Sequence, residues 1–445
     1  MIRRRSLLEA CAASIALGTL CPASAVARGR TPYGGRLALH VPWPVSSIDP
    51  HRIDDAAAAL FGDALFDTLY ARGEAGEIVA SLAEADPDPA GSTLRVTLRH
   101  GVRFASGGIL DARAAAQSIA RARARDAGPW LTEVPAPRVD GDALVFAMHD
   151  VRKLVRALAS PLVAVVSPHF LPERPDGTGP MRADLQAGGL VLSRNTLAAS
   201  GPSFLDTIEA RHAPDLVTSL RAFESSADDV GWLGSFLHEP RQGARSFDAG
   251  AVAWAVLRTG RDAGPLDVRG TAQALADGVP HSALASLVVG PSWTQGAAQW
   301  TGAPCELLVR DDAPWLVEVA RGLAASLSSP SHEISVRPIP SGDVVQRRAS
   351  RAYALLLDVA RPAGPGGLGA LVGLATADDP STAAALVRHP PRGDLSPRTA
   401  TRTMRLGVVG EVRLQGGRAG DVMLPTSRWG RGVDWGGAFR GRPTG

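Results

Sequence analysis

The first 27 residues set the conditions under which the rest of the chain has to fold. They read MIRRRSLLEACAASIALGTLCPASAVA, in which three arginines precede an apolar stretch and small residues follow in two A-x-A arrangements. This order is typical of a cleavable export signal. The apolar run at 10–20 has about half of the roughly 20 residues that a membrane-spanning helix needs. We therefore predict an exported protein with a signal peptide at 1–27 and a periplasmic location.

The export route has two candidates. Arg4-Arg5-Ser6-Leu7-Leu8 fits the twin-arginine form of such signals. Lys153 is the only lysine, however, so almost any basic signal region in this chain would be written with arginines. Twin-arginine and general secretory export therefore both stay open.

The cysteine count requires the exported chain to be held together by its core. Cys11 and Cys21 lie in the signal, so Cys305 is left alone and no intramolecular disulfide can form. Hydrophobic residues make up 45% of the chain, which is enough for a large core. The length suggests two or three domains.

The charge pattern argues against a nucleic-acid partner. The formal net charge is +3, and arginines alternate with aspartates and glutamates along the whole chain. A nucleic-acid-binding surface would show clustered basic residues with aromatics between them.

Alternating strands and helices predict an α/β protein. Apolar runs and period-two alternation predict strands at 36–41, 94–99, 143–148, 161–166, 190–195, 204–211, 305–310, 332–339 and 353–359. Helices are predicted at 55–70, 111–126, 214–226 and 267–289 and after Asp312, which would cap the last of them. The Gly-rich segments at 238–265 and 360–370 are predicted to be irregular, the first as a domain junction, and no long helix is expected after 390.

A glycine-rich motif follows the strand at 353–359 but lacks the context of a cofactor site. GPGGLG at 364–369 matches G-x-G-x-x-G. A dinucleotide site needs an acidic residue about 20 positions further on, after a second strand. Asp378 and Asp379 come too early and no strand intervenes. We interpret the motif as a loop and predict no cofactor.

Sequence signals for catalysis and metal binding are weak. His332-Glu333 is not followed by the second histidine of a zinc motif, and G-x-S-x-G does not occur. Cys305 opens an apolar strand and is interpreted as a buried small residue rather than a nucleophile. We predict no catalytic residue and no metal ligand.

Tryptophans beside breaker residues are candidate ligand contacts. Trp43, Trp232 and Trp293 each lie near Gly, Pro or Ser. An indole in such a place can stack on a ligand in a cleft, or it can pack at a domain edge. Trp43 and Trp232 are the two that we predict to contact a ligand.

Several segments, taken in order, resemble the family 5 extracellular solute-binding proteins, the oligopeptide-, dipeptide- and nickel-binding group of ABC importers. The segments are SSIDPH (46–51), LFDTLYARGEAGEIVASLAEA (65–85), STLRVTLRHGVRFASGGILDARAAAQSIARAR (92–123), GTGP (177–180), LSRN (192–195), GPSFLDTIEAR (201–211) and DVRGTAQALADG (267–278). No single segment is decisive, but their order and spacing extend over most of the exported chain.

The resemblance implies a two-lobed α/β clamp of type II with an extra N-terminal subdomain. Ligand would bind between lobes that close by hinge bending. The implied division is 28–60 for the first part of lobe one, 61–168 for the subdomain, 169–249 for the continuation of lobe one, 250–400 for lobe two and 401–445 for the return to lobe one. The implied function is delivery of a small peptide or similar polar solute to the membrane subunits of an ABC permease by a monomeric binding protein without enzymatic activity.

One departure from the family bears on the ligand. Peptide-binding members carry an aromatic- and aspartate-rich stretch after a second-lobe strand, whereas this chain reads LLLDVARPAGPGG at 355–367. Asp358 and Arg361 are the only charges there and become our candidates for pairing with the ends of a ligand. The loss of the motif favours one alternative, a degenerate member that acts as a sensor or accessory binding protein without transport. An exported hydrolase is a separate alternative, although no catalytic triad or metal-ligand spacing is visible in the sequence.

Overall fold

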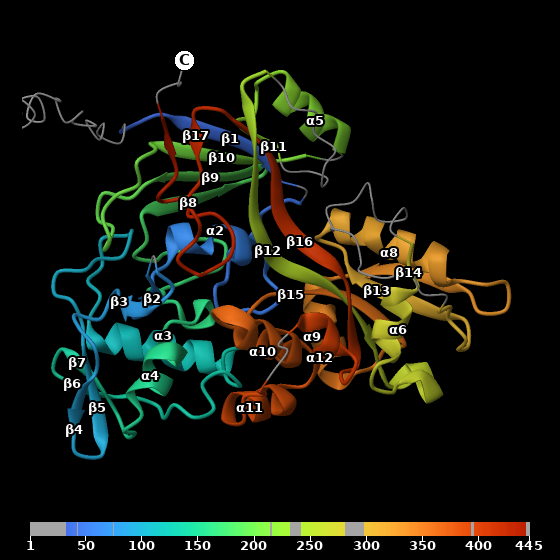
Figure 1. The fold of residues 1–445 in the computed structure, drawn as a ribbon, viewed down its shortest axis with the longest axis horizontal. Coiled ribbons are helices and arrows are strands. Elements are labelled where there is room, and N and C mark those ends of the chain that lie inside the picture. The colour runs from blue at the N-terminus through green and yellow to red at the C-terminus, as the bar shows by residue number, and fades with distance from the viewer. Residues whose placement is uncertain are drawn as a thin grey trace, which may run out of the picture. The chain divides into compact units, whose positions relative to one another are not determined.

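One mixed sheet of ten strands organises the fold (Figure 1). The computed structural model describes residues 33–41, 43–73, 75–213, 216–231, 242–280, 298–392 and 396–441, so the signal segment lies outside the described residues. The strand order is β14-β13-β15-β12-β16-β11-β1-β10-β9-β8. Helices are interleaved with these strands, which confirms the predicted α/β class.

The sheet has two halves on either side of a central pair of long strands. The first half contains β1 (Arg36–Val41), β8 (Met181–Gln186), β9 (Gly189–Arg194), β10 (Thr207–His212) and β11 (Val230–Gly231). The second half contains β13 (Cys305–Arg310), β14 (Ile334–Ile339) and β15 (Leu355–Ala360). Most of these strands match the sequence predictions to within a few residues.

Two long antiparallel strands join the halves. β12 (Ala244–Thr259) pairs with β15, β16 (Leu406–Ala419) pairs with β11, and the two pair with each other. The irregular segment that we predicted at 238–265 is therefore wrong for most of its length. Every residue from 251 to 259 is buried, so flanking glycines and arginines concealed a fully buried strand. The pairing shifts register between residues 248 and 256, as β-bulges do.

Parallel pairing within each half brings the carboxyl ends of strands to one edge. β1 runs parallel to β10, and β13 runs parallel to both β14 and β15. α8 (Pro314–Leu327) connects β13 to β14 and buries an apolar face on them. It begins after Ala313 without a side-chain cap, so the predicted Asp312 cap is wrong, because that carboxylate binds Arg310 instead. α9 (Ser341–Ser350) connects β14 to β15.

A small sheet with two helices forms a second core. The sheet consists of β4 (Asp88–Ala90), β5 (Thr93–Thr97), β7 (Ala143–Phe146) and β6 (Arg138–Asp140), in that order. Two helices, α3 (Ala112–Ala124) and α4 (Val151–Leu158), share its hydrophobic core. Asp111 caps α3 as predicted, its Oδ1 accepting the Ala114 N–H at 2.7 Å. The strand predicted at 161–166 is wrong: Pro161–Val163 is a 3-10 turn that Ser160 caps. These elements lie within 61–168, whose boundaries stay a prediction.

The remaining elements are short. They are α2 (Ala56–Leu65), β2 (Tyr70–Arg72), β3 (Ile78–Ala80), α5 (Leu216–Glu224), α6 (Thr271–Asp277), α10 (Gly366–Asp378), α11 (Pro380–Arg388), α12 (Pro397–Thr401), β17 (Val422–Met423) and β18 (Phe439–Arg440). The loop predicted at 360–370 is too long, because α10 begins at Gly366. In the part of the chain that is described, no long helix follows residue 390, as predicted, and no helix is long and apolar enough to cross a bilayer.

A buried carboxylate on α2 forms hydrogen bonds with the C-terminal segment. Asp63 accepts hydrogen bonds from the Ser427 hydroxyl at 2.6 Å and from the Arg428 N–H at 3.1 Å. The pKa of the Asp63 carboxyl is raised to about 7, mainly by burial. Arg428 opposes this rise and Asp434 adds to it. A carboxyl that resists ionisation in the folded state opposes folding wherever the unfolded chain is ionised.

This gives a pH-dependent prediction for Asp63→Asn. In the unfolded chain the Asp63 carboxyl has a pKa of about 4, so between about pH 4 and pH 7 the native state holds a proton that the unfolded chain has lost. The free energy of unfolding should therefore fall as pH rises through this range. The loss should be on the order of 3 kcal/mol. Asp63→Asn should unfold at the same denaturant midpoint as wild type near pH 4 and at a higher midpoint at pH 8. Parallel midpoint curves for the two proteins would contradict the shift.

Candidate functional site

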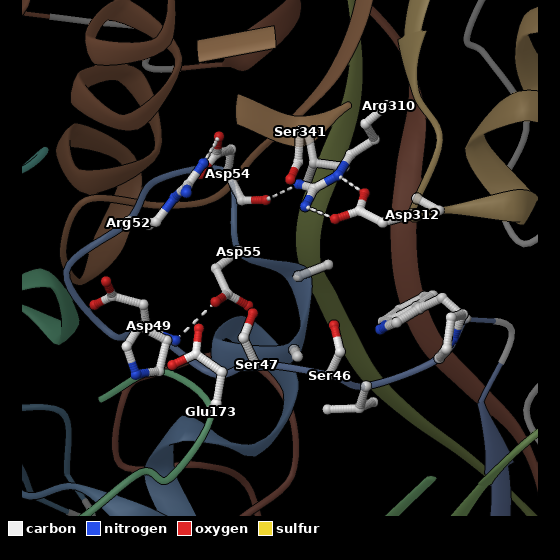
Figure 2. A pocket seen from close by; sticks show the side chains of 18 of the residues that line it. Ser46, Ser47, Asp49, Arg52, Asp54, Asp55, Glu173, Arg310, Asp312 and Ser341 are labelled. Carbon is white, nitrogen blue, oxygen red and sulfur yellow. Dashed lines mark hydrogen bonds and ion pairs between the residues drawn. The ribbon is translucent and has the colours of Figure 1, made fainter. Parts of the chain in front are cut away.

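A cavity of about 260 Å³ lies at the carboxyl ends of parallel strands from both halves of the sheet. Its walls come from the segment that follows β1 (residues 43–57), from the segment that follows β13 (residues 310–315) and from Ser341 after β14 (Figure 2). Val359 of β15, Arg125, Pro172 and Glu173 complete the lining. Crevices outside the carboxyl ends of parallel strands are the usual ligand sites of α/β sheets. We therefore take this cavity as the candidate site.

Two indoles form the apolar part of the wall. Trp43 comes from the segment after β1 and Trp315 from the first turn of α8, and their ring centroids are 5.4 Å apart with a 40° tilt. Both side chains are buried. The structure thus places Trp43 in the wall of a cavity, although its contact with a ligand stays a prediction.

Most charged groups around the cavity are already paired inside the protein. Arg52 holds Asp54 through two hydrogen bonds, Nε to Oδ1 at 2.8 Å and Nη2 to Oδ2 at 2.7 Å. Arg310 holds Asp312 in the same bidentate way, at 2.5 Å and 2.8 Å. Bidentate guanidinium–carboxylate pairs have fixed geometry, so these groups give the cavity a rigid polar wall.

Three charged groups of the lining have no ion pair with any other described residue. They are Asp55, Glu173 and Arg125. Asp55 caps α2, its oxygens accepting the N–H groups of Ala58 at 2.8 Å and Asp49 at 2.7 Å, and burial raises the pKa of its carboxyl. Figure 2 shows the Asp55 and Glu173 carboxylates on the same side of the cavity. Groups of both signs are therefore available to a polar solute.

The motif SSIDPH is fixed to α3 behind the cavity. Arg121 donates to both oxygens of Asp49, at 2.9 Å and 2.7 Å, and to Nδ1 of His51 at 2.7 Å. Nε2 of His51 donates to the Ala164 carbonyl at 2.8 Å, and burial lowers the pKa of this imidazole to about 4. A neutral His51 thus joins two of the sequence motifs and ties the cavity-lining segment to α3.

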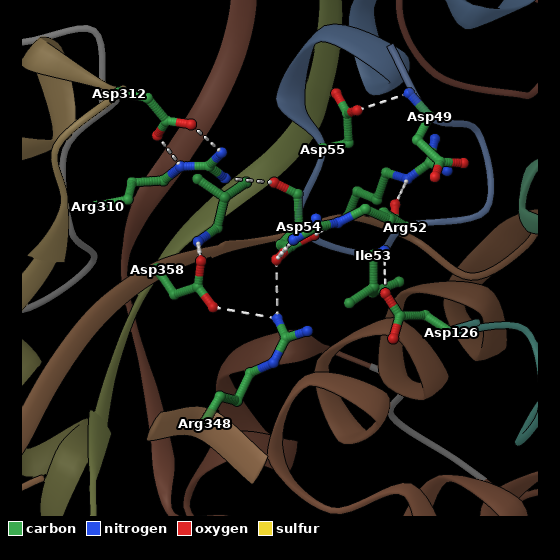
Figure 3. A network of polar contacts seen from close by, with 12 residues as sticks. Asp49, Arg52, Ile53, Asp54, Asp55, Asp126, Arg310, Asp312, Arg348 and Asp358 are labelled. Carbon is green, nitrogen blue, oxygen red and sulfur yellow. Dashed lines mark hydrogen bonds and ion pairs between the residues drawn. The ribbon is translucent and has the colours of Figure 1, made fainter. Parts of the chain in front are cut away.

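Asp358 and Arg361 lie outside the lining of the cavity. Asp358 is fully buried, and its carboxylate is 3.5 Å from Arg258 Nη2. The same carboxylate is 3.3 Å from Arg348 Nη1 (Figure 3). Arg361 is 1% exposed and donates from Nε to the Arg52 carbonyl at 2.8 Å and from Nη2 to the Pro50 carbonyl. Both charges are used within the protein. Their ligand roles stay predictions, as does that of Trp232, which lies outside the described residues.

Trp43 is the only described residue of the cavity wall that sequence reasoning selected as a ligand contact. The residues it missed include Glu173, Arg310, Asp312 and Trp315. A signal for the last three was present, since they end or directly follow the predicted strand 305–310 and the carboxyl ends of parallel strands carry ligand sites. Glu173 has no such signal, because it lies in a loop. Among the described residues, no group of three or more His, Cys, Asp or Glu side chains is placed to hold a metal ion.

Comparison with known proteins identifies the architecture. No model of a known protein family matches the chain, and no significant sequence match to a curated protein is found. Among solved structures, the oligopeptide-binding protein AppA from Bacillus subtilis in complex with a nonapeptide has a TM-score of 0.66 at 12% identity, covering 93% of this chain and 100% of that one. The pheromone receptor PrgZ has 0.68 at 12%, covering 92% and 99%.

A third solved structure has the same architecture. NikA from Staphylococcus aureus in complex with Ni(L-His)2 has a TM-score of 0.62 at 15% identity, covering 91% of this chain and 100% of that one. At such identities the likeness concerns the fold. The chain has the two-lobed α/β fold of these solute-binding proteins, as the sequence resemblance implied.

Proposed function

We propose that this chain is a periplasmic solute-binding protein of an ABC importer. It is exported by the signal at 1–27, binds a small peptide or similar polar solute between its two lobes, and delivers that solute as a monomer to membrane permease subunits. The binding step requires no catalysis and no cofactor. The observation that carries the proposal is the cavity between the two halves of the sheet, with two indoles on one wall and charges of both signs that have no ion pair among the described residues.

The chemistry of the cavity supports a polar solute of modest size. Its volume of about 260 Å³ lies near the lower end of ligand pockets. Asp55 or Glu173 can pair with a cationic group, Arg125 can pair with an anionic group, and the indoles can cover an apolar body between them. A dipeptide has all three features. The solved structures that share the fold hold a nonapeptide and Ni(L-His)2 in the cases named above.

Ligand retention tests the proposal directly. Native mass spectrometry of the full exported chain, purified from the periplasm without denaturation, should show a bound mass that disappears on unfolding. The identified compound should then bind the stripped protein in calorimetry with one site per chain. If no bound mass is retained and no member of a di- and tripeptide panel changes the melting temperature, the proposal is wrong.

Trp43→Leu should weaken binding of that compound by at least about tenfold, because the flat indole face is lost while the side chain stays apolar. Calorimetry measures the change. Trp130→Leu is the matched control: Trp130 is also buried, but it lies away from the cavity and its Nε1 donates to the Ala157 carbonyl at 3.1 Å. The control should lose stability and keep its affinity. Equal affinities for both variants would remove Trp43 from the site.

A further inference from the structure

We propose that Arg348 is a latch that holds the two halves of the sheet closed over the cavity before any solute binds. The inference rests on the proposed function, since it concerns access to the same site. It differs from closure driven by ligand contacts, because all of the groups involved belong to the chain itself. Removal of the Arg348 guanidinium should open the cavity of the ligand-free protein.

The first observation is that Arg348 joins carboxylates from opposite halves. Arg348 lies on α9 of the second half, and its Nη1 is 3.0 Å from Oδ2 of Asp54 and 3.3 Å from Oδ2 of Asp358 (Figure 3). Asp54 belongs with the first half, because it lies in the segment that follows β1. α2 begins two residues after it and packs against β8 and the joining strand β12. Asp358 lies on β15 of the second half. One guanidinium therefore spans the boundary between the halves beside the cavity wall.

The second observation is that both carboxylates are inaccessible to water. Asp54 is 2% exposed and Asp358 is fully buried. Burial would raise the pKa of Asp54, but Arg348 and Arg52 outweigh that effect and hold it well below its usual range. The ion pair between Asp54 and Arg348 therefore stays ionised at physiological pH. Because the pair is buried, added salt should screen it only weakly.

A second layer of contacts fastens the same segment to the second half. The Arg361 N–H donates to the Ile53 carbonyl at 3.0 Å, and its guanidinium donates to two carbonyls of residues 50–52. Arg310 Nη1 lies 3.5 Å from the Asp54 carbonyl. On the other side, the Ile53 N–H donates to Asp126 at 2.8 Å, just beyond α3. Several contacts from the second half therefore converge on the loop 50–54.

The strands that join the halves offer a place for motion. β12 and β16 are the strands that connect the two halves within the sheet, and their pairing shifts register between residues 248 and 256. Bulges disrupt the ladder locally and bend the strand, which suits a hinge. If the latch keeps most molecules closed, a solute can enter only the open fraction, and its association rate falls in proportion.

Arg348→Gln in the ligand-stripped, full exported chain tests the latch, with two readouts that require no ligand. Amide hydrogen exchange of residues 51–58 should become at least about tenfold faster than in wild type, and the radius of gyration from X-ray scattering should rise. Arg347→Gln is the matched control. Arg347 is the exposed neighbour on α9, and it donates to the Ala352 carbonyl. The control should leave both readouts unchanged.

Arg348→Lys keeps the positive charge but removes the planar guanidinium. It is a second test in case the glutamine variant, which leaves two buried carboxylates without this cation, does not fold. It should give intermediate exchange. The latch is refuted if the folded lysine variant or the folded glutamine variant exchanges and scatters like wild type. Retention of a bound mass by wild type would be unaffected by that result, so failure of the latch and failure of the proposed function are distinguishable.

Discussion

Asp358→Ala is expected to lower the free energy of unfolding by about 3 to 5 kcal/mol, because it leaves buried guanidinium charge without its partner. Asp358 is fully buried between Arg258 and Arg348. Arg258 has a side chain that is only 3% exposed, and Asp358 is its ion-pair partner among the described residues. Denaturant unfolding of the purified variant, followed by tryptophan fluorescence, measures the loss.

Asp343→Ala is the control for this variant. Asp343 is an exposed carboxylate in the first turn of α9 and has no ion pair with any described residue, so its loss should change stability by less than about 0.5 kcal/mol. If Asp358→Ala keeps wild-type stability and loses affinity for the solute, Asp358 is a ligand contact rather than a structural charge. That result would also remove one partner from the proposed latch.

The parts of the fold that the sequence predicted are those with strong local signals. Strands 36–41 and 305–310 have clear apolar runs, and Asp111 has the position of a helix cap. β12 was missed because burial on both faces removes the alternation that marks a half-buried strand. Segment 161–166 is apolar because it is buried, and its proline and Ser160 cap make it a turn instead.

The candidate site was harder to predict because its walls come from distant segments. Trp43 and Trp315 are far apart in the sequence and meet only because β1 and β13 end at the same cavity. Asp358 and Arg361 stand out in the sequence as isolated charges in and after an apolar strand. Their partners, Arg348 and the carbonyls of residues 50–52, can be identified only from the folded chain.

Gly369→Ala is expected to lower the free energy of unfolding by about 3 kcal/mol or more, because the added methyl group meets rigid backbone. A Cβ at Gly369 would lie 1.8 Å from the carbonyl oxygen of Gly364, which lies in the turn between β15 and α10. The Ala363 N–H also donates to the Gly369 carbonyl at 2.9 Å, so the turn cannot move away without losing that bond. The glycine motif at 364–369 thus has a packing role here.

Gly342→Ala provides the matched control, since Gly342 is also a helical glycine but has open space where a Cβ would be. Alanine there should raise stability by up to about 1 kcal/mol, because it reduces the conformational freedom of the unfolded chain. Chemical denaturation of both variants separates steric crowding from helix propensity. Equal stability changes would show that the turn before α10 can relax, and the packing explanation of the glycine motif would then fail.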